Sequence, residues 1–219
     1  MNSSELLGVF RDEMADLKEP YLWTDSEAFG FEDDAQQQFC RKTNGIIDAR
    51  TAAVTQIAIV PGTDWYTTHA SILNIRKITR ADTGRRVDML TAEQADERGL
   101  YFLATQLGPV KYAVLGLEPH AVRIQPMPNE TVTLNMSVCR LPLVAITDLG
   151  DQAFEIDAMH HLGMLLWMKH RAYDKQDAET FDRRKSDDFA ARFEAYCAKA
   201  KLEQERARRV RGAVAYGGI

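Results

Sequence analysis

The stretch Thr131-Val-Thr-Leu-Asn-Met-Ser-Val-Cys-Arg140 decides the fold class. Its apolar side chains fall on alternate positions: Val132, Leu134, Met136 and Val138. A period of two is typical of a β-strand with one buried face. Residues 112–117 and 121–125 predict two more strands before it. The connections between the three strands are too short for crossovers, so we expect an antiparallel β-meander.

β structure is also predicted further upstream. The β-branched residues of the segment 54–60 predict a strand that runs into the turn Pro61-Gly62. Isoleucines and Val87 flank Asp82-Thr83-Gly84, which indicates a hairpin turn. Residues 90–98 predict a short helix, capped by Thr91 with Glu93 close by.

Helices are predicted before this β-rich region. Residues 3–17 form an amphipathic pattern that Pro20 ends, and its apolar members are Leu6, Leu7, Phe10, Met14 and Leu17. A second helix starts at Thr24 or Asp25, with Glu27 in a capping-box position. Its inner face is expected to be Ala28, Phe31, Ala35 and Phe39.

Helices are predicted after the β-rich region as well. From Phe154 to about Tyr173 the expected apolar face is Met159, Leu162, Leu165, Leu166 and Met168. A break at 174–177 precedes a charged helix from about 178 to 209, which would be a rod roughly 45–50 Å long. Helices that flank a group of strands usually pack together.

We therefore predict an α+β fold: a helical bundle body with an inserted antiparallel β lobe and a long C-terminal helix. The expected segments are N-terminal bundle helices at 1–51, the lobe at 52–140, C-terminal bundle helices at 141–211 and a flexible tail at 212–219. A length of 219 residues fits one domain with such an inserted lobe.

Composition and charge narrow the class of protein. Cys40, Cys139 and Cys197 are odd in number and far apart, so reduced thiols are expected. We expect no signal peptide, because the N-terminus lacks a basic start and an apolar core, and no membrane span.

Residues 1–50 hold 5 Lys/Arg against 11 Asp/Glu, a net charge of −6, whereas residues 183–211 hold 10 against 5, a net charge of +5. This asymmetry indicates complementary surfaces, within a subunit or between neighbours.

Residues with potential for chemistry form no recognisable site. His160, His161 and His170 lack a metal-binding spacing, and we expect them to be structural or incidental. The run Glu32-Asp33-Asp34 is expected to be a solvated helix face. We found no phosphate-binding glycine loop and no nucleophile elbow. We therefore predict that the chain has no catalytic, cofactor-binding or metal-binding residue. The alternative is an enzyme of unrecognised type.

The C-terminal end is densely basic. Its arginines are Arg206, Arg208, Arg209 and Arg211. Three readings stay open: a solvated helix end, a protein-docking surface, or a nucleic-acid-binding helix, although Glu203 and Glu205 interrupt the patch. In the small-residue tail beyond, Tyr216 and Ile219 are the sizeable anchors.

The order and spacing of several short motifs carry a family resemblance over about residues 20–205. The motifs are Leu22-Trp23-Thr24-Asp25-Ser26-Glu27 leading to Ala35-Gln36 and Cys40-Arg41, Val60-Pro61-Gly62-Thr63-Asp64-Trp65-Tyr66, Gly108-Pro109-Val110-Lys111-Tyr112, Arg123-Ile124-Gln125-Pro126-Met127-Pro128, and Tyr173-Asp174-Lys175-Gln176-Asp177-Ala178-Glu179. In this pattern the chain resembles the bacteriophage head-to-tail adaptor, or connector, proteins. One departure is Glu155-Ile156-Asp157, where a proline is expected to open the helix.

The resemblance implies a structural virion protein rather than an enzyme. Its members form a homo-oligomeric ring, usually a dodecamer, between the portal and the tail, which lines the DNA exit channel. The implied partners are the portal, tail nozzle or tail tube proteins and tail fibres. Double-stranded DNA passes without specific binding, no cofactor or membrane is involved, and the protein is in the host cytoplasm during assembly. The resemblance also makes the portal the expected partner of the C-terminal end, with docking residues Arg206, Arg208, Arg209, Arg211, Tyr216 and Ile219.

Overall fold

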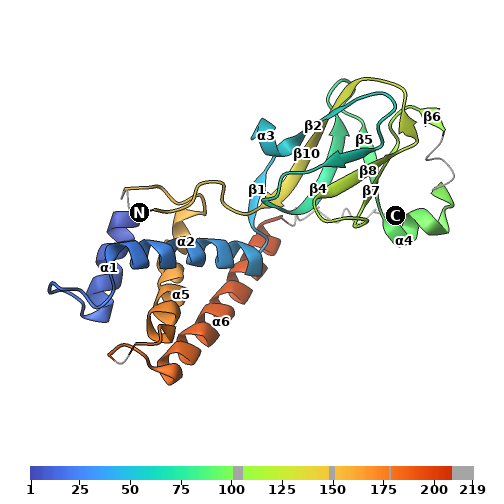
Figure 1. Cartoon of the computed structure of the whole chain (residues 1–219). Coiled ribbons are helices and arrows are strands. Elements are labelled where there is room, and N and C mark those ends of the chain that lie inside the picture. The colour runs from blue at the N-terminus through green and yellow to red at the C-terminus, as the bar shows by residue number, and fades with distance from the viewer. Residues whose placement is uncertain (101–105, 148–150, 178, 209–219) are drawn as a thin grey trace, which may run out of the picture. The chain divides into compact units, whose positions relative to one another are not determined.

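The computed structural model describes residues 1–100, 106–147, 151–177 and 179–208, without the side chain of Arg208. The chain forms two compact units (Figure 1). Met1–Asn44 and Val144–Ile219 make up the helical unit, and Gly45–Leu143 makes up the β unit. Helices and a curled sheet in one chain confirm the α+β class.

The helical unit is built from α-helices and a short 3-10 turn. They are α1 (Ser3–Met14), α2 (Asp25–Lys42), the 3-10 turn η2 (Ala158–His160), α5 (His161–Asp174) and α6 (Arg183–Arg208). The predicted capping box of α2 is present, since the side chain of Thr24 accepts from the backbone of Glu27 and the Glu27 side chain bonds back. Helix α1 ends at Met14 rather than at 17, because Ala15 adopts a left-handed conformation with φ of 55°.

Helix α5 packs against α1, α2 and α6 through only part of the predicted face, since Leu165 and Met168 are buried as predicted. Met159 and Leu162 are 67% and 59% exposed. Met164 and Ala172, which were not part of the predicted face, are buried together with Leu165 and Met168. Apolar residues occur all round this segment, so helical spacing alone allows more than one inner face.

Helix α6 begins at Arg183, five residues later than predicted. Asp182 stops the helix from starting earlier, because its carboxylate accepts from the backbone N–H of Lys185 at 3.1 Å in the manner of an N-cap. The helix has 26 residues, which makes it about 39 Å long. Phe193 is fully buried, whereas Phe181 and Leu202 are exposed.

Gly163 lets α5 and α6 approach closely. A Cβ atom at this position would lie 2.2 Å from Cε1 of the Tyr196 ring. The Tyr196 hydroxyl is in turn hydrogen-bonded to Nδ1 of His160 at 3.0 Å. The absence of a side chain at Gly163 therefore provides the space that the Tyr196 ring occupies.

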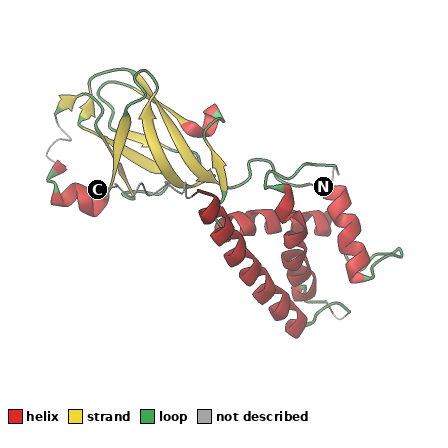
Figure 2. Ribbon diagram, turned by 180° about the vertical axis from the view of Figure 1, so that it is seen from behind, coloured by secondary structure: helices red, strands yellow, loops and turns green. Residues whose placement is uncertain are grey.

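The β unit contains short helices and a strongly curled sheet (Figure 2). Its elements are β1 (Ile46–Asp48), α3 (Ala52–Thr55), β2 (Gln56–Ile59), β3 (Trp65–Thr67), β4 (Ile72–Arg80), β5 (Arg86–Thr91), α4 (Ala92–Glu97), β6 (Leu107–Gly108), β7 (Tyr112–Leu115), β8 (Ala121–Gln125), β9 (Met127–Pro128) and β10 (Val132–Arg140). The main sheet has the order β1-β10-β4-β5-β7-β8-β3, and β2 also pairs with β10. Val54 thus lies in α3 and not in a strand.

The meander prediction is wrong in its pairing. Strands β7 and β8 are antiparallel neighbours as expected, but β10 pairs with β1, β2 and β4 instead of β8. Strands β5 and β7 are parallel, joined through a crossover that contains α4. The predicted hairpin between β4 and β5 is present, with Ile78 opposite Val87. The predicted cap Thr91 is also correct, and Gln94 completes its capping box.

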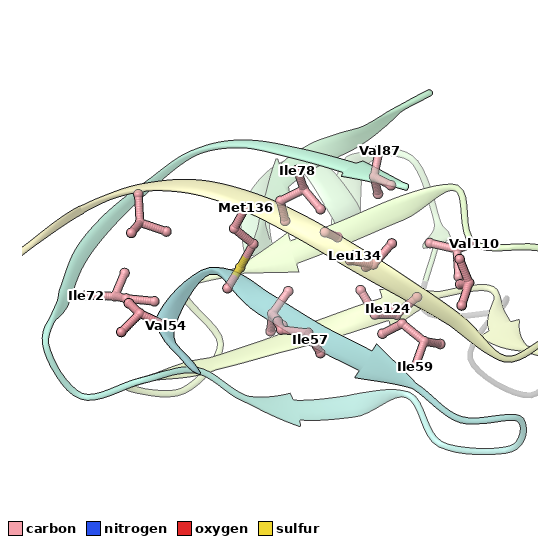
Figure 3. Close-up of a cluster of buried hydrophobic side chains, with 14 residues drawn as sticks. Val54, Ile57, Ile59, Ile72, Ile78, Val87, Val110, Ile124, Leu134 and Met136 are labelled. Atoms are coloured by element: carbon pink, nitrogen blue, oxygen red, sulfur yellow. The ribbon is translucent and has the colours of Figure 1, made fainter. Parts of the chain in front are cut away.

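The alternation of β10 is confirmed, and it forms the centre of the β core. Val132, Leu134, Met136 and Val138 are all buried. Figure 3 shows Leu134 and Met136 among isoleucine and valine side chains from other elements of the β unit.

Arg140, the last residue of β10, forms a buried ion pair with Asp48 of β1 at 2.7 Å. Burial opposes ionisation of Asp48, but N–H donors from Arg50 and Thr51 and the Arg140 guanidinium outweigh it and hold the pKa of this carboxyl well below its usual range.

Candidate interaction surfaces

The predicted docking residues lie at the end of α6 and beyond it. Arg206 is exposed on the last turns of α6. Arg208 belongs to the helix, but its side chain lies outside the described residues, as do Arg209, Arg211, Tyr216 and Ile219. The structure therefore gives a position for one of the six predicted side chains.

The histidines singled out from the sequence pack within the helical unit. His160 and His161 are buried, and His161 contacts the carbonyl oxygen of Ile156 through Nε2 at 3.1 Å. His170 is hydrogen-bonded to the hydroxyl of Ser186 at 2.9 Å. Burial lowers the pKa of His160, which favours the neutral ring. In the part of the chain that the structure describes, no cluster of His, Cys, Asp or Glu could hold a metal ion.

The prediction of a solvated acidic face on α2 is wrong. Asp33 accepts a hydrogen bond from the backbone N–H of Ile146 at 2.9 Å. Asp34 accepts from the indole of Trp167 on α5 at 2.8 Å. Glu32 has no exposed surface at all. Helix α5 and the segment that follows the β unit cover this face, and Asp33 and Asp34 bind α2 to them.

Glu32 is a buried carboxyl without a hydrogen-bond partner among the described residues. Burial raises its pKa to about 9, so the side chain is protonated at neutral pH. The Nε2 atom of Gln36, one turn further along α2, also lacks a partner there. The Oε1 atom of the same side chain accepts from the backbone of Glu155 at 2.8 Å.

The loop at residues 15–22, between α1 and α2, is a candidate interaction surface that the sequence did not reveal. Leu17 and Leu22 are 62% and 44% exposed in it. Its backbone is held by Asp16, which pairs with Arg11 at 2.9 Å and accepts from the N–H of Leu22 at 2.9 Å. The Arg11 guanidinium also lies 3.5 Å from the centroid of the Tyr21 ring. The loop thus presents two leucines on a fixed backbone.

The β unit carries a basic groove of about 510 Å³ beside the β4–β5 hairpin. Arg85, Arg86 and Lys111 line it, are exposed, and make no ion pair with other described residues. Arg80 is also present but is committed to Asp82 at 2.7 Å and to Glu130. The parallel pairing of β5 with β7 brings Lys111 beside the hairpin, and the sequence did not predict that pairing.

A model of the family described as SU10 adaptor protein matches residues 1–216 of the chain. The match includes the β unit together with both segments of the helical unit. No curated protein matches the chain. Within the described residues, no helix combines the length and the apolar character needed to cross a membrane.

Proposed function

The chain belongs to the SU10 adaptor protein family, and we propose that its copies form a ring between the portal and the tail of a phage virion. The family is one of structural phage adaptors and not of enzymes, which gives the protein a place in the virion among other head and tail proteins. The ring would line the channel through which DNA leaves the head, without binding it specifically. The family match over residues 1–216 carries this proposal.

Closed rings require heterologous contacts, in which one face of a subunit meets a different face of the next. Uneven charge supports such contacts, since residues 1–44 hold 4 Lys/Arg against 10 Asp/Glu. We propose twelve copies, as is usual for head-to-tail adaptors.

Native mass spectrometry of the purified chain, alone and with the portal protein of the same phage, tests the ring. We expect a mass of twelve copies bound to the portal oligomer. A chain that stays monomeric at high concentration both with and without the portal would show that the proposed function is wrong.

The C-terminal end is proposed to dock on the portal through Arg206 and the basic residues that follow. A chain that ends at Ala207 should keep its fold, because the buried α6 residues Phe193, Cys197 and Ala200 remain. Portal binding should be lost or strongly weakened, and the affinity of the intact chain should fall with added salt. Equal binding of the truncated and intact chains would contradict the docking proposal.

The β unit is proposed to provide the surface for tail-side partners, such as nozzle, tail tube or fibre proteins. Replacing Gly45–Leu143 with a short Gly/Ser linker should leave a helical unit that unfolds cooperatively, because each unit has its own buried core. The variant should still bind the portal but no longer bind the tail. Loss of cooperative unfolding would show that the helical core depends on the β unit.

A further inference from the structure

The basic groove of the β unit carries charged side chains that have no ion-pair partner among the described residues. Arg85, Arg86 and Lys111 make no ion pair with described residues, and Asp88 is the one carboxylate among the lining side chains. The buried side chain of Val110 also lines the groove. A groove of about 510 Å³ accommodates a few side chains. Its chemistry suits a segment that combines carboxylates with an apolar residue.

The loop at residues 15–22 and the end of α1 carry the complementary pattern. Asp12 and Glu19 are exposed and make no ion pair with described residues. Lys18, which lies between them in the sequence, is exposed, and its positive charge would attract the carboxylate of Asp88. The side chain of Leu17 in the same loop is exposed to solvent. The Arg11–Asp16 pair holds the loop in place, so docking it would cost little conformational entropy.

We propose that the loop at 15–22 of one copy docks into the basic groove of the neighbouring copy. This inference rests on the proposed ring and names one of its heterologous contacts. Asp12 and Glu19 would face Arg85, Arg86 and Lys111, and Leu17 would enter the groove.

Duplex DNA is an alternative ligand that the basic side chains of this groove could bind. The carboxylate of Asp88 would repel a phosphate backbone but suits the mixed charges of the loop. The apolar contribution of Val110 has no use in a phosphate contact. The groove is also confined to a few residues of the β unit, whereas DNA-binding faces carry extended basic patches.

Charge reversal on each side, followed by mixing, tests the contact between copies. One variant carries Arg85→Glu and Arg86→Glu, and the other carries Asp12→Arg and Glu19→Arg. Each variant alone should need an about tenfold higher protein concentration for half-maximal assembly, measured by sedimentation velocity and on the portal of the same phage. An equimolar mixture of the two should assemble at nearly the wild-type concentration, because each altered surface then meets its opposite charge.

The double variant Arg76→Glu, Lys77→Glu is the matched control, since both side chains are exposed on the β unit outside the groove. Its assembly should equal that of the wild type, and thermal unfolding should show all variants to be folded. If the groove variant assembles like the wild type while the wild type forms rings, the contact is wrong and the proposed function stands. A mixture of the two variants that fails to assemble would also overturn the contact. So would a groove variant whose sole defect is the loss of duplex DNA binding. A wild-type chain that never associates would overturn both proposals.

Discussion

Replacing Glu32 with glutamine should stabilise the helical unit, and increasingly so as pH rises. The carboxyl has no exposed surface and no hydrogen-bond partner among the described residues. Burial raises its pKa from an ordinary value of 4.5 to about 9. Between these two values the folded protein keeps a proton that the unfolded chain has released, so this group lowers the stability as pH increases.

The size of the effect follows from that window. One pH unit within it corresponds to roughly 1.4 kcal/mol. At pH 7 the protonated carboxyl therefore costs the folded state about 3 kcal/mol relative to its contribution below pH 4.5. A glutamine has nearly the same size and cannot ionise, so Glu32→Gln removes this contribution. The two proteins should be similar near pH 4.5 and diverge steadily above it.

Urea unfolding at pH 5, 6, 7 and 8 measures the divergence. Trp65 lies in the β unit, whereas Trp23 and Trp167 lie in the helical unit. A Trp65→Phe background therefore makes tryptophan fluorescence report on the helical unit alone. Glu19→Gln, which removes an exposed carboxyl from the same unit, is the control. A stability difference between Glu32→Gln and its parent that does not grow with pH would refute the reasoning.

Two further substitutions test packing and a buried charge. Gly163→Ala should destabilise the protein by about 1–3 kcal/mol, because its Cβ would lie 2.2 Å from a Tyr196 ring atom. Gly30→Ala, on an open face of α2, should instead stabilise by about 0.5–1 kcal/mol, and thermal unfolding that ranks the two the other way would contradict the packing. Asp48→Asn should cost about 3–5 kcal/mol at pH 7, because the buried ion pair between Asp48 and Arg140 is lost. That loss should shrink as pH falls and the wild-type carboxyl becomes protonated, and a constant loss down to acid pH would count against the ion pair.

Local signals in the sequence were sufficient for several elements. Thr24 and Glu27 lie three residues apart, so the capping box is visible without any knowledge of the fold. The alternation in Val132–Arg140 predicts both a strand and its buried face. The turn Asp82-Thr83-Gly84 predicts the hairpin because it lies between the two strands that it joins. Each of these depends on residues within a few positions of one another.

The loop at 15–22 and the basic groove depend on contacts between distant residues, and the sequence did not predict them. The sequence pattern extends the first helix to residue 17, because Leu17 continues its apolar spacing. In the structure the left-handed conformation of Ala15 ends the helix before the loop at 15–22. The basic groove exists because β5 pairs with β7 in parallel, which brings Lys111 to Arg85 and Arg86. Local patterns state which face of a strand is apolar but not which strand lies beside it.

By itself, the sequence determined the α+β class, the strand at Val132–Arg140, the helix caps at Thr24 and Thr91, and the family resemblance. Only the tertiary structure decided which face of α5 is buried, that Glu32 lies inside the helical unit, and the order of the strands. The physical reason is that caps, turns and periodicity arise from neighbouring backbone groups, which any short segment contains. Burial and strand order arise from the removal of apolar surface from water by partners far along the chain, and many pairings satisfy the same local pattern.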